Sequence, residues 1–553
     1  MMNMTGGEAL VEQLVLEGVT DTFGVPGVQL DWATDALRKA KDRIRLYVPR
    51  HEQATSYMAD GYARVSGRPG VCMVVPGPGL LNATAGLATA YSCNSPVVCI
   101  TAHINSAAID RGRGLLHEIK NQSGVLGAVT KWNGRARSTS EIPSLVREAF
   151  RQATSGRPQP VGIEIPHDLL QGKAEIALVP PDGQSGRVRP QPSAIDAAAA
   201  MLDGARFPVI YVGGGVQASA AAAELEELAE ALDAAVVLGE NGRGALSDRH
   251  PLMLNAVGGR AVFPHADVAL IVGSRFIDTT SGQPILQPGK TRFIFLNADP
   301  AAWAAPQSPA LTVHADAKLG LAALAAAVRR RAPSRAADIA KVRDWVNAQI
   351  ATLEPQRSWL RALRVSLPDD GIFVNELTQV GYVARSHFPV FEPGTFLSPG
   401  YQGTLGYGFP TSLGAAVAAQ GRPVVAITGD GGFGWAMQEL ATAARYRLNV
   451  TIVLFNDGRF GNIRTFQLQK FGEAFADELY NPDFCLLAAA FGVRHARVDT
   501  PEALEKLMPS VMREGGPTLI EVPVSDMPSP WHLMRLTPPP PSYVPPPNPL
   551  GEA

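Results

Sequence analysis

The chain contains few cysteines and almost no excess charge. Its 553 residues include four cysteines, Cys72, Cys93, Cys99 and Cys485, which lie far apart and in no metal-ligand spacing. We therefore expect neither a disulfide framework nor a cysteine-based zinc site, but buried free thiols in a reducing cytoplasm. The formal net charge is −2. This balance gives no reason to expect a nucleic-acid partner or attachment to an anionic membrane surface.

The sequence also lacks long hydrophobic runs. No stretch of 18 apolar residues occurs, so no transmembrane span is expected. The N-terminal sequence MMNMTGGEALVEQLVLEG carries acidic residues where a signal peptide would be basic, and it predicts an amphipathic first helix. With 46% hydrophobic and 18% charged residues, the composition is that of a soluble globular protein. The length is too great for one core and indicates about three domains.

Three segments show apolar runs that alternate with helical patterns, which is typical of parallel sheets wrapped by helices. We predict an α/β chain of three doubly wound parallel-sheet domains at residues 1–175, 190–335 and 357–530. A linker rich in proline and glycine, VPPDGQSGRVRPQPS, separates the first two. The proline-rich tail, residues 531–553, is expected to be extended and to lie on the surface or across an opening.

The first and third segments resemble each other. VCMVVPGPG is followed by a small-residue helix and NSPVVCITA, and VVAITGDGG is followed by a helix and NVTIVLFND. Strand, glycine turn, helix and strand thus occur in both segments at similar lengths. Because any βαβ unit has this order, the similarity alone leaves open whether the two domains share more than that unit.

Two acidic residues, Asp430 and Asp457, each follow an apolar run and lie beside glycine. The runs VVAITG and VTIVLFN are typical of strands buried on both faces of a parallel sheet. A right-handed crossover would place both carboxylates at the carboxyl edge of that sheet, where ligands bind. Two carboxylates there repel each other unless a cation lies between them, and oxygen ligands favour Mg²⁺. Gly431 and Gly432 open the connecting helix and leave N–H groups for a diphosphate.

For each aspartate alone, an N-cap or an ordinary turn is the alternative. The pair at this spacing favours the metal site, and it resembles the metal and diphosphate motif of thiamine diphosphate enzymes. The resemblance covers about residues 4–530 and implies pyrimidine-binding, central and diphosphate-binding domains in that order. It implies Mg²⁺ held by the side chains of Asp430 and Asp457 and the backbone carbonyl of Arg459. The family usually has asparagine where this chain has Asp457, which keeps an oxygen ligand and adds a negative charge.

Two further stretches resemble cofactor-binding segments of this family. PRHEQATSYMADGYARVSG implies that Glu52 is the glutamate that hydrogen-bonds the cofactor's pyrimidine ring and activates it; a first-turn helix acid is the alternative. GTLGYGFP implies that Leu405 bends the cofactor; a core leucine is the alternative. The resemblance implies further cofactor contacts at Asn375, Glu376, Gly403, Thr404, Gly429, Gly431, Gly432, Phe460 and Gly461.

Substrate-facing positions are also implied by the resemblance. FGVPGVQ aligns with a loop where relatives carry an acid, serine or histidine, and it presents Val28 and Gln29. RGRGLLHEIKNQ places His117 where acetolactate synthases and benzaldehyde lyase carry glutamine, with Gln122 as a further candidate that holds the loop. With an unperturbed pKa of about 6.5, a histidine can transfer a proton near neutral pH. The alternative is a histidine packed on a turn and bonded to Glu118.

The chain is most similar to acetolactate synthase-like large subunits and to 2-oxo acid decarboxylases such as 5-guanidino-2-oxopentanoate decarboxylase. It lacks the GTDAFQE-like and GMHG-like signatures of acetolactate synthases. The resemblance implies cleavage or formation of a C–C bond next to a carbonyl, by 2-oxo acid decarboxylation or carboligation. A 2-hydroxyacyl-CoA or acyloin lyase with the same cofactor is the alternative, and a non-catalytic homologue is disfavoured because the site residues are retained.

Glu52 and Asp430 lie in different segments, and in relatives they come from different subunits. The resemblance therefore implies a homodimer or homotetramer with active sites at the subunit interface. Glycine turns at residues 213–215 and 273–276 leave FAD or ADP in the central domain open, but do not favour either.

Overall fold

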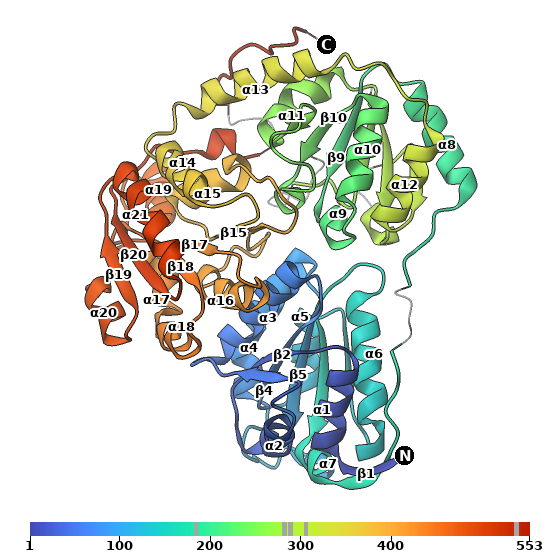
Figure 1. Ribbon diagram of the computed structural model, residues 1–553, viewed down its shortest axis with the longest axis vertical. Helices are drawn as coiled ribbons and strands as arrows, with labels where there is room; N and C mark the ends of the chain where they lie inside the picture. Colours follow the sequence, from blue (N-terminus) through green and yellow to red (C-terminus); the bar gives the residue numbers. More distant parts are fainter. Residues whose placement is uncertain (182–185, 279–284, 286–290, 304–307, 536–540, 553) are drawn as a thin grey trace.

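Short buried runs rich in valine and isoleucine form three six-stranded sheets in which all neighbouring strands are parallel. The computed structural model describes residues 1–181, 186–278, 285, 291–303, 308–535 and 541–552. Figure 1 shows three helix-wrapped domains: the N-terminal one in blue to cyan, the central one in green and the C-terminal one in orange to red. The predicted fold class is confirmed.

The N-terminal sheet has the strand order β3-β2-β4-β5-β7-β6. Its strands are β2 (Asp21–Gly24), β3 (Arg45–Tyr47), β4 (Gly70–Val74), β5 (Val97–His103), β6 (Trp132–Arg135) and β7 (Val161–Pro166). Its helices are α1 (Gly6–Leu16), α2 (Asp31–Lys39), α3 (Glu52–Ser66), α4 (Pro78–Cys93), α5 (Gln122–Val129), α6 (Ile142–Thr154) and α7 (His167–Gln171). A small antiparallel pair joins β1 (Met2–Thr5) to β8 (Lys173–Ile176). The first helix, α1, begins with a capping box between Thr5 and Glu8.

The C-terminal sheet has the order β16-β15-β17-β18-β20-β19. Its strands are β15 (Ile372–Asn375), β16 (Phe396–Leu397), β17 (Val424–Gly429), β18 (Val450–Asn456), β19 (Arg494–Arg497) and β20 (Thr518–Pro523). Its helices are α14 (Gln356–Ser366), α15 (Gln379–His387), α16 (Gly408–Ala418), α17 (Asp430–Gly434), α18 (Leu440–Tyr446), α19 (Gly461–Phe471), α20 (Phe484–Ala490) and α21 (Pro501–Glu514). Counted within each domain, both terminal sheets have the order 2-1-3-4-6-5. Their sequence similarity thus reflects a common topology.

The central sheet has a different order, β11-β10-β9-β12-β13-β14. Its strands are β9 (Pro208–Val212), β10 (Ala235–Leu238), β11 (Met253–Leu254), β12 (Val268–Val272), β13 (Arg292–Asn297) and β14 (Leu311–His314). Its helices are α8 (Pro192–Asp203), α9 (Gly214–Ala218), α10 (Ala222–Leu232), α11 (Ala256–Val262), α12 (Ala317–Ala327) and α13 (Ala336–Ile350). Counted within the domain this is 3-2-1-4-5-6, the order of dinucleotide-binding folds, which reverses between β9 and β12.

The N-terminal and C-terminal domains pack against each other through α3 and α16. A Cβ at Gly61 would overlap the carbonyl oxygen of Thr411, and one at Gly414 would overlap that of Met58. Glycine at these two positions therefore permits the close approach of the helices. In the described part of the chain, none of the helices is long and apolar enough to cross a membrane.

Two parts of the proline-rich tail are described: Trp531–Leu533 form a 3-10 turn, and residues 541–552 lie on the surface of the central domain. The Asn548 amide donates to the carbonyl oxygen of Ala261 at 3.0 Å, and the Trp345 indole donates to that of Pro546 at 3.4 Å. The tail contains no helix or strand over these residues. Residues 541–552 thus lie on the surface, which is one of the two positions expected, whereas Trp531 at the start of the tail lines a cavity.

Candidate functional site

Asp430 and Asp457 lie at the carboxyl ends of two neighbouring strands. β17 and β18 pair in parallel with Gly429 opposite Phe455, and each aspartate follows its strand within two residues. Asp430 is buried. Burial, and secondly the charge of Asp430, raise the pKa of Asp457 to about 6. The structure therefore brings the two predicted ligands together in a setting where their negative charges repel each other.

Two side chains that the sequence interpretation missed hold these carboxylates. The Asn481 amide donates to Oδ2 of Asp430 at 2.6 Å. The Gln379 amide donates to Oδ2 of Asp457 at 3.0 Å, and the backbone N–H of Arg459 donates to its Oδ1 at 3.3 Å. Asn481 lies in a loop and Gln379 at the start of α15. Neither belongs to a local pattern, because only the folded chain brings them to the carboxylates.

A cavity of about 350 Å³ opens beside the two carboxylates. Most of the implied cofactor and metal contacts line it: Glu376, Gly403, Thr404, Leu405, Gly429, Asp430, Gly431, Gly432, Asp457, Arg459, Phe460 and Gly461. A Cβ at Gly432 would overlap the Glu376 carboxylate, and one at Gly431 would crowd the Phe460 ring. In the described part of the chain, the lining comes from residues 356–531 only.

The connection between β17 and β18 differs from the single helix that was expected. It consists of the five-residue α17, a 3-10 turn at Met437–Glu439, and α18. Glycines at positions 431, 432 and 434 disfavour a continuous helix because they lose more backbone entropy than other residues. Only the first turn of a short helix therefore presents the N–H groups of Gly431 and Gly432.

Glu376 holds the loop that carries Leu405. Its carboxylate accepts hydrogen bonds from the Thr428 hydroxyl at 2.5 Å and from the backbone N–H groups of Gly406 and Gly408 at 2.9 and 3.3 Å. Burial is the main cause that raises the pKa of Glu376 to about 7. Leu405 itself is 40% exposed, so it is not a core leucine. The buried Glu376 carboxylate thus fixes the loop through its backbone N–H groups, while the apolar side chain of Leu405 remains partly exposed.

Two other implied contacts in this domain have different surroundings: Asn375 lies outside the cavity, and Thr404 lines the cavity and also contacts the N-terminal domain. Asn375 is fully buried and does not line the cavity; its amide donates to the carbonyl oxygen of Gly381 at 3.2 Å. The Thr404 hydroxyl lies 2.7 Å from the hydroxyl of Tyr57 in the N-terminal domain. Thr404 therefore connects the cavity loop to α3.

Glu52 is the first residue of α3, in the N-terminal domain. The backbone N–H groups of Arg50 and His51, just before it, donate to the buried Glu439 at 3.1 and 3.0 Å. The Asn82 amide donates to Oε2 of Glu52 at 3.0 Å. Glu52 does not line the cavity of Asp430. The two halves of the implied site are thus not joined within the described part of one chain.

The structure brings Gln29 and His117 together. Nδ1 of His117 lies 3.0 Å from Oε1 of Gln29, whose Nε2 donates to the carbonyl oxygen of Leu116 at 3.2 Å. Because the amide oxygen of Gln29 can only accept, Nδ1 of His117 carries a proton, and Nε2 of His117 is left for other partners. Glu118 instead accepts the backbone N–H of Leu115 at 2.8 Å. The neighbouring Val28 is 63% exposed.

Gln122 is buried, with a side chain fully engaged inside the N-terminal domain. Its Oε1 accepts the backbone N–H of Gly77 at 3.2 Å, and its Nε2 donates to the carbonyl oxygen of Ala102 at 3.0 Å. A third contact joins Nε2 to Glu164 at 3.2 Å. The structure therefore places Gln122 behind the loop of His117.

Known proteins match the chain along most of its length. Three family descriptions match: "Thiamine pyrophosphate enzyme, N-terminal TPP binding domain" at residues 4–125, its "central domain" at 195–324 and its "C-terminal TPP binding domain" at 377–522. The chain belongs to the thiamine pyrophosphate enzyme family. The resemblance predicted from the sequence is confirmed, and two of the three matching descriptions are of thiamine pyrophosphate-binding domains.

Individual relatives of this thiamine pyrophosphate enzyme have two kinds of activity in their names. A probable 2-ketoarginine decarboxylase of Pseudomonas aeruginosa is 34% identical over 535 residues, which cover 94% of each chain. A probable acetolactate synthase large subunit of Methanocaldococcus jannaschii is 32% identical over 564 residues, covering 97% of this chain and 94% of the relative. The acetolactate synthase isozyme 2 large subunit of Escherichia coli is 29% identical over 553 residues, covering 96% and 97%. The enzyme thus belongs with decarboxylases and acetolactate synthases.

The central domain of this enzyme holds a second cavity of about 440 Å³. It lies at the carboxyl ends of β9, β10, β12 and β13, where the strand order reverses and such sheets bind ligands. Its lining includes both glycine turns noted in the sequence, residues 213–215 and 273–276. Four residues line both cavities: Leu377, Tyr382, Gly403 and Trp531.

Proposed function

We propose that this enzyme decarboxylates a 2-oxo acid with thiamine diphosphate held through Mg²⁺. Thiamine diphosphate, when bound, supplies an electron sink for the charge left as the bond next to the carbonyl breaks. The side chains of Asp430 and Asp457 and the carbonyl oxygen of Arg459 would hold the cation. Their fit rests on the close pair of acids, the buried Asp430 and the half-buried Asp457, whose mutual repulsion a divalent ion relieves.

The glycines beside this pair support a diphosphate in the same cavity. A side chain at Gly432 would meet the Glu376 carboxylate, and one at Gly431 would meet the Phe460 ring. The N–H groups at the start of α17 suit a phosphate oxygen, because they have no partner within the helix. Leu405 would support the bent cofactor from the loop that Glu376 fixes, and Glu52 would hydrogen-bond its pyrimidine ring.

The main support for decarboxylation that ends in an aldehyde is the contact between Gln29 and His117. It fixes a proton on Nδ1 and leaves Nε2 to bind, hold and deliver a second proton. A proton delivered at the reacting carbon yields an aldehyde, whereas in carboligation that carbon bonds to a second carbonyl and the proton goes to the oxygen of that carbonyl. Acetolactate synthases carry glutamine at the aligned position, so His117 favours the decarboxylase.

The relatives suggest the substrates to try first. The probable decarboxylase among them is named for 2-ketoarginine, which is 5-guanidino-2-oxopentanoate. Carboligation is the second candidate, because acetolactate synthases also match nearly the whole chain. Pyruvate serves as the substrate that would distinguish this second reaction.

A homodimer or homotetramer would complete the site. The cavity lining from residues 356–531 and the position of Glu52 outside it support a site shared between two chains. The four free thiols support a reducing cytoplasm as the location.

The test is to incubate the purified protein with thiamine diphosphate, Mg²⁺ and a panel of 2-oxo acids, and to measure CO₂ and aldehyde separately. Equal amounts of both support a decarboxylase, and CO₂ with a ligated product but no aldehyde supports a carboligase. Release of an acyl-CoA from 2-hydroxyacyl-CoA thioesters, with no CO₂ from any acid, would contradict the proposal in favour of a lyase. The absorbance spectrum of the same sample tests whether a flavin occupies the central cavity.

A further inference from the structure

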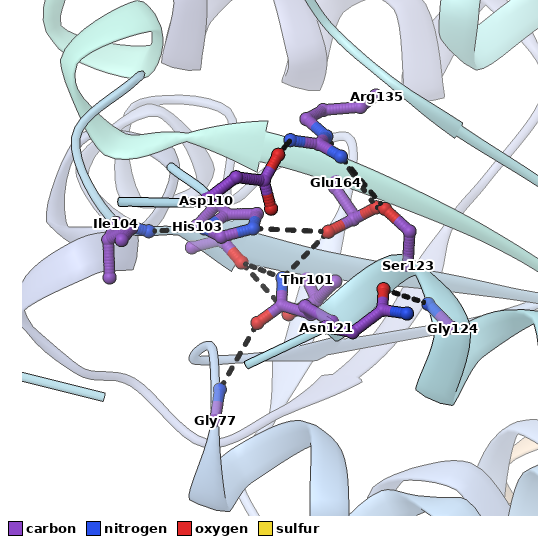
Figure 2. Close-up of polar contacts among 12 residues, drawn as sticks. Gly77, Thr101, His103, Ile104, Asp110, Asn121, Ser123, Gly124, Arg135 and Glu164 are labelled. Carbon is purple, nitrogen blue, oxygen red and sulfur yellow. Dashed lines mark hydrogen bonds and ion pairs between the residues drawn. The ribbon is translucent and has the colours of Figure 1, made fainter. Parts of the chain in front are cut away.

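A fully buried carboxylate, Glu164, lies near the carboxyl end of β7 and is surrounded by hydrogen-bond donors. Its Oε1 accepts from the Ser123 hydroxyl and lies 3.9 Å from the Arg135 guanidinium. Its Oε2 accepts from Nε2 of Gln122 at 3.2 Å and lies 3.4 Å from Nε2 of His103. Figure 2 shows Ser123, Arg135 and His103 directed at Glu164 from three different elements.

Donor groups of several neighbouring side chains face the Glu164 carboxylate. Nδ1 of His103 accepts the backbone N–H of Ile104 at 2.8 Å, so the ring proton lies on Nε2, facing the carboxylate. Burial is the main cause that lowers the pKa of His103 to about 4, so this imidazole is neutral near pH 7. Arg135 also lies 3.8 Å from the exposed Asp110. Burial raises the pKa of Glu164 itself, but the groups that contact its oxygens are donors, so its carboxylate serves as their acceptor and is held from several directions.

This fixed acceptor determines the orientation of the Gln122 amide. Nε2 of Gln122 faces two acceptors, the Glu164 carboxylate and the carbonyl oxygen of Ala102. A flipped amide would place oxygen against oxygen at both contacts. Oε1 of Gln122 is consequently held toward the backbone N–H of Gly77, which it accepts at 3.2 Å.

Gly77 in turn lies directly against the backbone of His117. Its φ is +59°, and a Cβ there would overlap the carbonyl oxygen of His117. His117 itself has a φ of +68°, which is uncommon for a non-glycine residue and requires support from its surroundings. Gly77 also precedes α4, whose Asn82 contacts Glu52. One glycine thus connects the buried carboxylate with both implied reaction groups of this domain.

We propose that Glu164 and Gln122 form a buried positioning pair that holds His117 in place through Gly77. The proposal rests on the proposed function for the role of His117, but not for the geometry. Glu164 orients Gln122, Gln122 holds the N–H of Gly77, and Gly77 supports the strained backbone of His117. Both members of the pair are buried, so both act through the loop that presents Nε2 of His117.

The first test measures the loop and requires no substrate. Gln122→Met keeps the side-chain length but leaves Gly77 without its acceptor, and Glu164→Met removes the group that orients Gln122. Thr130→Val is the matched control, because it removes a buried hydrogen bond at the other end of α5, from the Thr130 hydroxyl to Leu126 at 2.7 Å. Hydrogen–deuterium exchange of backbone amides in residues 110–118 is followed by mass spectrometry in all three.

Both methionine variants should exchange these amides about tenfold faster than the wild type, and Thr130→Val should not, because only they release the loop. Circular dichroism shows which variants are folded. Exchange equal to that of Thr130→Val in either folded methionine variant would overturn the proposal. Loss of the fold in both variants would also overturn it, since the pair would then be structural.

The second test separates positioning from general destabilisation. In the holoenzyme, with the 2-oxo acid that is turned over fastest, Gln122→Met should lower kcat about tenfold by misplacing His117. In a His117→Ala background the same change should cost less than about twofold, because its effect passes through His117. Equal losses in both backgrounds would overturn the positioning role. If no 2-oxo acid is turned over, the proposed function fails, while the exchange measurement still decides the geometry.

Discussion

The side-chain amide of Gln379 joins the Asp457 carboxylate to the C-terminal segment of the chain. Its Nε2 donates to Oδ2 of Asp457 at 3.0 Å, and its Oε1 accepts the backbone N–H of Met527 at 2.7 Å. Groups that orient a metal ligand typically contribute tenfold to a hundredfold in metal affinity. We therefore expect Gln379→Leu to weaken Mg²⁺-dependent binding of thiamine diphosphate about tenfold. Isothermal titration calorimetry at fixed cofactor concentration measures this change.

Gln356→Leu is the matched control for Gln379→Leu. The Gln356 amide donates to the carbonyl oxygen of Pro528 at 2.6 Å, so it anchors the same segment without a contact to Asp457. Its loss should leave the Mg²⁺ dependence nearly unchanged. Equal weakening in both variants would mean that the segment, and not the orientation of Asp457, governs cofactor retention.

Glu376 gives a pH-dependent prediction about stability. Its pKa is raised to about 7, mainly by burial, so the folded chain binds its proton more tightly than the unfolded chain does. The free energy of unfolding of the wild type therefore decreases as the pH rises from about 4.5 to 7. Above pH 7 it stays lower, because the buried carboxyl of Glu376 is then ionised. Glu376→Gln removes the titrating group and hence this decrease, by up to about 3 kcal/mol.

The measurement is the difference in Tm between wild type and Glu376→Gln, without metal or cofactor, from pH 4.5 to 8. The difference should shift in favour of the variant up to about pH 7 and then level off. Glu392→Gln, at an exposed carboxylate of the same domain, should show no such trend. A difference for Glu376→Gln that stays constant across this range would show that Glu376 is ionised throughout.

His117 gives a prediction about the order of product release. If Nε2 of His117 delivers the proton that forms the aldehyde, His117→Ala should slow aldehyde release about a hundredfold and CO₂ release far less. Gln29→Leu should act in the same direction but more weakly, since it removes only the anchor of Nδ1. Rapid-quench measurement of both products in the first turnover tests this. Parallel slowing of CO₂ and aldehyde would assign His117 an earlier role.

The meeting of Asp430 and Asp457 was predictable because it depends on local features. Each follows a buried strand, and a crossover places the two strand ends at one edge of a sheet. Asn481 and Gln379 were not predictable, because they reach the carboxylates from a loop and a helix that carry no recognisable pattern. The three glycines that divide the crossover into α17 and α18 were visible in the sequence, but their effect on the helix was underestimated.

The domain topologies were also predictable only in part. Alternating strands and helices predicted three parallel sheets, and turn signals placed the glycines of the central cavity at strand ends. The strand orders were not predictable, because pairing between distant strands depends on contacts that local patterns do not encode. The buried bonds of Glu376 and Glu164 were missed for a related reason: an isolated glutamate in a sequence does not reveal which donors surround it.

The position of Glu52 outside the cavity of Asp430 leads to a prediction about subunits. Glu52→Gln removes the proposed partner of the pyrimidine ring, and Asp430→Asn weakens the proposed cation site, so each variant alone should be almost inactive. If two chains share each site, a mixed dimer holds one site with both native residues. Because half of randomly paired dimers are mixed, co-expression should restore about a quarter of wild-type activity.

The same experiment distinguishes a site built within one chain. In that arrangement every subunit of a mixed dimer retains one defect, and co-expression restores nothing above the two variants alone. Differently tagged chains allow the mixed dimer to be purified, so its activity per dimer can be compared directly with the wild type. A value near half would establish that Glu52 of one copy serves the carboxylates of the other, which joins the two half-sites that lie apart in a single chain.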